Sequence, residues 1–188
     1  MHEFSHALTA YKLGDTTAKN SGRLTLNPLA HIDVIWTFIL PLFLFISTQG
    51  RFVFGAAKPV PINYWALRNP KKDIIWVGLS GPLANFIFAV ILSIIVRNIS
   101  LPTINPILLR LAIINVVLGV FNLIPIPPLD GSRVLMGLLP YNLSEKYALI
   151  EPYSFFLLMG LIWFNVIGNI IWPIAGFILN LLGIYNSG

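Results

Sequence analysis

Two histidines stand one helical turn apart at the start of the chain, in the motif HEFSH at residues 2–6. Residues four apart share one face of a helix, so the imidazoles of His2 and His6 can bind the same metal ion. Neutral imidazole suits Zn²⁺, which lowers the pKa of a bound water to about 7. Glu3 can take a proton from that water without being a ligand. The motif therefore predicts a zinc-dependent hydrolase.

A catalytic zinc site needs a third protein ligand, for which the sequence offers two candidates. Asp130 follows the proline-rich segment 125–129 and precedes Gly131, which permits a tight turn. A carboxylate beside an apolar helix is costly and marks a functional site by default. His31 is the alternative, and it equally suits a loop histidine at a membrane interface. We expect Asp130 to be the third ligand.

A further polar residue, Asn122, lies shortly before Asp130 at the end of an apolar run. An amide in such surroundings needs a hydrogen-bond partner. Its side chain could hold the backbone of a substrate or steady a developing oxyanion. It could equally make a hydrogen bond between helices. The sequence leaves both interpretations open.

The composition is that of a membrane protein. Of the 188 residues, 56% are apolar and only 10% are charged, whereas soluble domains carry about 25% charged residues. The formal net charge of +5 does not indicate nucleic acid binding, because the basic residues lie between apolar runs rather than in one stripe. There is no cysteine, which excludes disulfides and thiolate ligands.

Apolar runs and helix breakers predict an all-α polytopic membrane protein with about four to five membrane helices. A helix is expected over 2–13, ending at Gly14. The clearest transmembrane helix covers 74–96, where small residues such as Gly78 let neighbouring helices approach closely. The other expected elements are a polar loop or hairpin over 15–31, an apolar run over 34–48, an extended segment over 52–61, a second span over 104–126 and a long apolar segment over 153–185, kinked or broken at Asn169 or Pro173.

The apolar run over 34–48 is short for a membrane span and contains Pro41. If it dips into the bilayer and returns, all 12 Lys and Arg residues except Arg97 and Arg110 fall on one side. If it crosses, the basic residues divide almost evenly. The positive-inside rule therefore predicts a re-entrant segment and a metal site toward the cytoplasm. The extended segment over 52–61 either accepts a substrate by strand addition or is a structural turn.

These residues, in this order, resemble the site-2 protease family of intramembrane zinc metalloproteases, in particular its short prokaryotic subgroup without appended domains. The resemblance is carried by HEFSH (2–6), GRLTLNPLAHID (22–33), AKPVP (57–61), LRNPKKD (67–73), GPLANF (81–86) and NLIPIPPLDG (122–131). It implies one catalytic Zn²⁺ held by His2, His6 and Asp130, with Glu3 as the general base and Asn122 in the substrate region. It also implies hydrolysis of peptide bonds in membrane-protein substrates, in or near the bilayer.

Residues 1–188 are expected to form a single membrane-embedded metalloprotease domain in a prokaryotic plasma membrane. Members of the family carry an apolar half-helix before the first histidine, so we expect further apolar residues upstream of His2. The connectors are too short for a regulatory domain, which leaves regulation to a separate protein. Two alternatives remain from other functional classes: a non-catalytic membrane scaffold derived from such a protease, and a metal-binding membrane transporter.

Overall fold

The computed structural model describes residues 1–27, 39, 42, 45–46, 60–99 and 102–184. Most of the expected re-entrant run over 34–48 and of the extended segment over 52–61 lies outside this part. In the described residues every regular element is helical, which confirms the all-α class. The chain divides into two compact units, one formed by Glu3–Arg68 and the other by Met1–His2 with Asn69–Gly188.

The unit Glu3–Arg68 is built on helix α1 (His2–Lys12), with the short helices α2 (Thr17–Asn20) and η3 (Tyr64–Ala66). The predicted helix over 2–13 is thus confirmed, and it ends at Lys12, shortly before Gly14, whose φ of +113° few other residues adopt. The loop expected over 15–31 contains α2 as a single helical turn.

Two features hold this unit together. One is a small apolar core of Ala7, Ala18 and Val60. The other is the fully buried carboxylate of Asp15, which accepts hydrogen bonds from the backbone N–H groups of Thr17 at 2.9 Å and Asn63 at 2.8 Å. A buried carboxylate with several donors ties together segments that are far apart in the sequence. The end of α1 is thereby connected to the residues that follow Val60.

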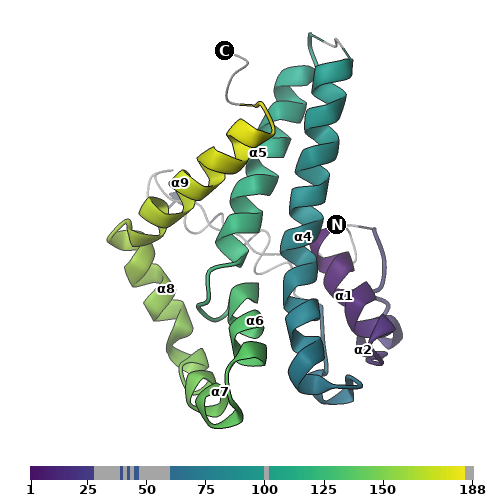
Figure 1. Cartoon of the computed structure of the whole chain (residues 1–188), viewed down its shortest axis with the longest axis vertical. Coiled ribbons are helices and arrows are strands. Elements are labelled where there is room, and N and C mark those ends of the chain that lie inside the picture. Colours follow the sequence, from purple (N-terminus) through teal and green to yellow (C-terminus); the bar gives the residue numbers. More distant parts are fainter. Residues whose placement is uncertain (28–38, 40–41, 43–44, 47–59, 100–101, 185–188) are drawn as a thin grey trace. The chain divides into compact units, whose positions relative to one another are not determined.

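The larger unit is organised around helix α4 (Pro70–Asn98), which packs along α5 (Asn105–Asn122) and α6 (Asp130–Leu138) (Figure 1). Helix α4 begins before the predicted span, since Pro70 suits a first helical turn and the Asp73 carboxylate accepts the Asn69 N–H at 2.8 Å. Helix α5 ends at Asn122, earlier than the predicted Ile126. Proline at 125, 127 and 128 cannot continue a helix.

Glycines set how closely these helices pack, as the sequence predicts for Gly78. A Cβ at Gly78 would lie 3.0 Å from the Asp130 carbonyl oxygen, and one at Gly119 would lie 2.7 Å from the ring of Phe86. Helices in a bilayer gain little from apolar burial against each other, so close van der Waals contact must supply the packing. Helices α4, α5 and α6 therefore lie against one another at positions that have no side chain.

The chain continues through α7 (Tyr141–Ala148), η4 (Glu151–Tyr153), α8 (Ser154–Trp163) and α9 (Val166–Leu181). The prediction of a kink or break at Asn169 or Pro173 is wrong in position, because both residues lie inside α9. The break falls at Asn165, which adopts the left-handed conformation at φ 55°. Asparagine tolerates that conformation better than most residues, and membrane helices tolerate an internal proline.

Two described helices, α4 and α5, are long and apolar enough to cross a membrane. A third candidate is the pair Tyr141–Trp163 and Val166–Leu181, whose axes are bent by 73°. The protein is therefore a helical chain with two or three candidate spans among the described residues. The expectation of four to five spans stays a prediction, since most of the run over 34–48 is not described.

Candidate metal centre

Helix α1 carries both histidines of the HEFSH motif on one face. His2 is the first residue of the helix and His6 follows one turn later. The side chain of His6 is buried, beside the buried Ala7 and Ala10, while His2 is partly exposed. A regular helix holds residues four apart on one face, so the two imidazoles are presented in the same direction.

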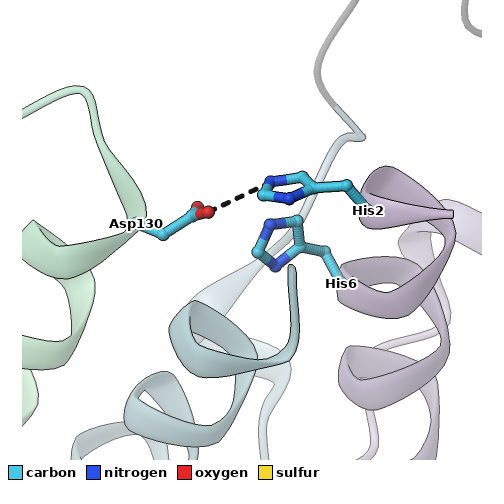
Figure 2. Close-up of side chains that lie close together, drawn as sticks. All are labelled: His2, His6 and Asp130. Atoms are coloured by element: carbon cyan, nitrogen blue, oxygen red, sulfur yellow. Dashed lines mark ion pairs between the residues drawn. The ribbon is translucent and has the colours of Figure 1, made fainter. Parts of the chain in front are cut away.

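Asp130 is the first residue of α6, directly after the loop that follows α5. Its Oδ2 atom lies 3.1 Å from Nε2 of His2, and the two side chains are 20% and 22% exposed. Figure 2 shows both imidazoles projecting from α1 on one side, with the carboxylate of Asp130 directed toward His2. One nitrogen from each histidine and one oxygen of Asp130 all lie within 4.8 Å of one another.

This donor set fits zinc. Zinc binds imidazole nitrogen and carboxylate oxygen at about 2.0–2.2 Å, so ligand atoms around a tetrahedral ion lie roughly 3.3 Å apart. The 3.1 Å between His2 Nε2 and Asp130 Oδ2 is close to that value. Since the donor atoms of all three residues lie within 4.8 Å of one another, small side-chain movements would bring them to the spacing that zinc needs. Three protein donors would leave one position open around a tetrahedral ion, as a catalytic zinc site needs.

Gly131 positions Asp130 by a close contact and not by the tight turn that the sequence suggests. It lies in the first turn of α6, and a Cβ there would meet the carbonyl oxygens of Leu123 at 2.2 Å and Ile124 at 2.6 Å. The loop from α5 therefore folds back until the start of α6 touches the end of α5. Asn122 and Asp130 are each one residue from this contact, so both lie at the same end of the helix pair.

Glu3 lies between the two histidines on α1, offset from their face because consecutive helical residues are about 100° apart. Its Oε2 atom accepts a hydrogen bond from the backbone N–H of Val60 at 3.1 Å. Val60 is buried and precedes Pro61, which favours an extended backbone at Val60. This contact fixes one carboxylate oxygen of Glu3 and leaves the other available.

Of the remaining candidates, only Asn122 lies among the described residues. The amide nitrogen of Asn122 donates to the Leu118 carbonyl oxygen in its own helix, at 2.9 Å. Within the part of the chain that the structure describes, Asn122 makes no hydrogen bond to another helix. His31 lies outside the described residues.

Two hydrogen-bond donors near the site, the Val60 N–H and the Tyr147 hydroxyl, were not predicted from the sequence. The N–H of Val60 is a backbone group, and only the proline on each side of it hinted at an extended segment. Tyr147, whose hydroxyl donates to the Pro125 carbonyl oxygen at 2.8 Å, lies in a segment with no recognisable motif. Contacts between positions so far apart in the sequence leave no local pattern.

Comparison with known proteins places zinc metalloproteases among the relatives of this chain. Residues 98–161 match the family model described as peptidase family M50. The chain is 34% identical over 183 residues to "Putative zinc metalloprotease YwhC" of Bacillus subtilis, covering 92% of this chain and 80% of that protein. It is 32% identical to "Putative zinc metalloprotease Rip2" of Mycobacterium tuberculosis, covering 86% and 61%, and 34% identical to "Zinc metalloprotease MJ0392" of Methanocaldococcus jannaschii, covering 52% and 31%. No solved structure gives a significant match to the chain.

The apolar helices, the two histidines with an aspartate, and these relatives define a zinc-dependent metalloprotease. Within that class, the chain belongs to peptidase family M50, the site-2 protease family. Its cofactor is Zn²⁺. The resemblance inferred from the motifs is thereby confirmed.

Proposed function

We propose that this metalloprotease is an endopeptidase that cleaves membrane-protein substrates within or beside the bilayer. The observation that carries the proposal is the position of Asp130 against an apolar helix. The backbone of Asp130 contacts Gly78 of α4, a candidate membrane span. Gly78 lies five residues after Asp73, the last charged residue before the apolar stretch, which corresponds to about 7 Å along the helix. A donor at that depth suits a substrate that is itself in the membrane.

His2, His6 and Asp130 are the proposed zinc ligands. The two imidazoles share one face of α1, and Asp130 lies beside His2. When bound, zinc supplies Lewis-acid polarisation of the scissile carbonyl and lowers the pKa of water at the open position. Two neutral imidazoles and two carboxylates, those of Asp130 and Glu3, give a neutral site around a divalent cation, which is cheaper to bury than a charged one.

Glu3 is the proposed general base. Its Oε2 atom is held by the Val60 N–H, so its Oε1 atom is the one available to a water molecule. Glu3 takes the proton from the water as it attacks the scissile carbonyl carbon, and then delivers it to the leaving amine. Asn122, at the end of α5, is the proposed contact to the substrate backbone, for which it must give up its hydrogen bond to Leu118.

The site is proposed to face the cytoplasm of a prokaryotic plasma membrane. Asp130 lies nearer the N-terminal end of α4, which begins at Pro70 and carries Lys71 and Lys72. Basic residues collect on the cytoplasmic side of membrane helices. The partners are then the lipid bilayer and an unwound segment of a membrane-protein or peptide substrate.

The ligand assignment is tested by Asp130→Asn. The amide is a weaker metal ligand than the carboxylate and does not balance the charge of zinc, so we expect zinc affinity to fall by roughly 10- to 100-fold, with loss of proteolysis. The measurements are zinc content of the purified protein and cleavage of a membrane-protein substrate. Full zinc content and full turnover in Asp130→Asn would show that Asp130 is not the third ligand, and His31 would become the candidate. A wild-type protein that binds zinc and cleaves no substrate would favour the scaffold.

The topology is tested by labelling single cysteines from each side of the membrane. The chain has no cysteine, so each introduced thiol is the only one present. We expect Lys19→Cys and Lys72→Cys, both at exposed positions, to label from the cytoplasmic side, because a re-entrant run over 34–48 leaves both there. Asn98→Cys, at the opposite end of α4, is the control that labels from outside. Labelling of Lys19→Cys and Lys72→Cys from opposite sides would instead mean that the run crosses the bilayer.

A further inference from the structure

The loop that delivers Asp130 is short of internal hydrogen bonds. Proline at 125, 127 and 128 leaves three of its positions without an N–H group. Two backbone hydrogen bonds lie within it. The Ile126 N–H donates to the Ile124 carbonyl oxygen at 2.8 Å, and the Leu129 N–H donates to the Ile126 carbonyl oxygen at 2.9 Å. A loop held by so few local bonds depends on contacts from elsewhere to keep one conformation.

Tyr147 of α7 supplies one such contact. Its hydroxyl donates to the Pro125 carbonyl oxygen at 2.8 Å, across 22 residues of sequence. The bond reaches the loop just before the residues that lead into α6. A hydrogen bond between segments so far apart restricts the loop more than a bond within it would, because it ties the loop to a separate helix.

A second contact from the same region lies just after Asp130. The carboxylate of Glu151 in η4 accepts two hydrogen bonds from the Arg133 guanidinium, at 2.5 and 3.4 Å. Tyr147 and Glu151 are one helical turn apart in sequence, and they hold residues on either side of Asp130. The end of α6 is fixed as well, because the Met136 carbonyl accepts from Lys71 Nζ at 2.5 Å and from Ser144 Oγ at 3.1 Å.

We propose that Tyr147 is a positioning residue for the metal centre, acting through Pro125 to hold Asp130 at the distance from His2 that zinc requires. The inference rests on the proposed role of Asp130 as a ligand. Glu151 is not the residue proposed for this role, because its side chain is 44% exposed and exposed ion pairs contribute little. Segment 147–151 carries no sequence motif. Through Asp130, which lies well before it in the chain, this segment influences the affinity of the site for zinc.

The test is Tyr147→Phe, which removes one hydroxyl group and keeps the ring. A hydrogen bond of ordinary strength corresponds to about a three- to tenfold change in an equilibrium constant, so we expect the zinc dissociation constant to rise by about that factor. It is measured by competition with a chelator in the full-length protein. Tyr141→Phe, in the same helix at an exposed position, is the matched control and leaves the constant unchanged.

Two further measurements separate positioning from general stabilisation. We expect the visible spectrum of Co²⁺ bound in place of zinc to change in Tyr147→Phe and not in Tyr141→Phe, and the melting temperature of the metal-free protein is measured beside it. Unchanged zinc affinity and an unchanged Co²⁺ spectrum in Tyr147→Phe would overturn the proposal, whatever happens to the melting temperature. If Asp130→Asn itself leaves zinc affinity unchanged, the ligand assignment fails. If Asp130→Asn lowers zinc affinity and Tyr147→Phe leaves it unchanged, only the positioning role of Tyr147 fails.

Discussion

Glu3→Gln is expected to lose proteolysis by about 10²- to 10⁴-fold while zinc remains bound. Glutamine has the shape of glutamate and keeps an oxygen that can accept the Val60 N–H, so the local structure is preserved. It has no basic oxygen to take the proton from water. Since Glu3 lies off the face of α1 that carries His2 and His6, the substitution leaves the three proposed ligands in place.

The measurements are zinc stoichiometry and the turnover number on the same preparation. Glu145→Gln, the same substitution at an exposed position of α7, is the control and keeps full activity. Full turnover in Glu3→Gln would remove Glu3 from the mechanism. Loss of zinc from Glu3→Gln would show that Glu3 is a ligand, and the general base would have to be sought elsewhere.

Gly131→Ala is expected to abolish both zinc binding and cleavage. The added Cβ would lie 2.2 Å from the Leu123 carbonyl oxygen and 2.5 Å from its carbon, and these are backbone atoms that cannot rotate away. The first turn of α6 must therefore shift, and Asp130 shifts with it. A metal ligand has to be held to about 0.5 Å, and a displacement of about 1 Å costs roughly 100-fold in activity.

The matched control is Gly160→Ala in α8, where a Cβ would meet nothing within 4 Å. It removes a helical glycine in the same way and should leave zinc content and turnover at the wild-type level. Circular dichroism establishes that both variants keep their helices. If Gly131→Ala bound zinc as well as Gly160→Ala does, the contact between α6 and the end of α5 would have no part in placing Asp130.

Local patterns in the sequence were sufficient for α1, α4 and α5, and for grouping His2, His6 and Asp130 as candidate ligands. The spacing of His2 and His6 is itself helical geometry, so α1 follows from the same residues that indicate zinc. Asp130 could be chosen because a carboxylate beside apolar helices is costly without a role. The sequence predicted α4 too short, since the charged residues Asp73 and Arg97 were taken as its boundaries, and a helix can extend past the edge of a membrane.

Contacts between distant positions could not be predicted in this way. Gly131 suggested a turn because glycine permits one, whereas its role is to let two backbones touch. Asn165 gave no stronger signal than Asn169 or Pro173, and the choice among them depends on how α9 packs against α5 and α8. Tyr147 is one of six tyrosines, and its role follows only from the position of Pro125.

The glycines of the larger unit carry a consequence for how this sequence can vary during evolution. Any side chain at Gly131 would collide with backbone atoms, and one at Gly78 would press on the carbonyl of Asp130 itself. At Gly160 and Gly176 there is open space. Selection should therefore retain glycine at the first two positions in every active homologue, while the last two drift freely to alanine, serine or larger residues. A comparison of homologous sequences would then separate glycines kept for the metal centre from glycines present by chance.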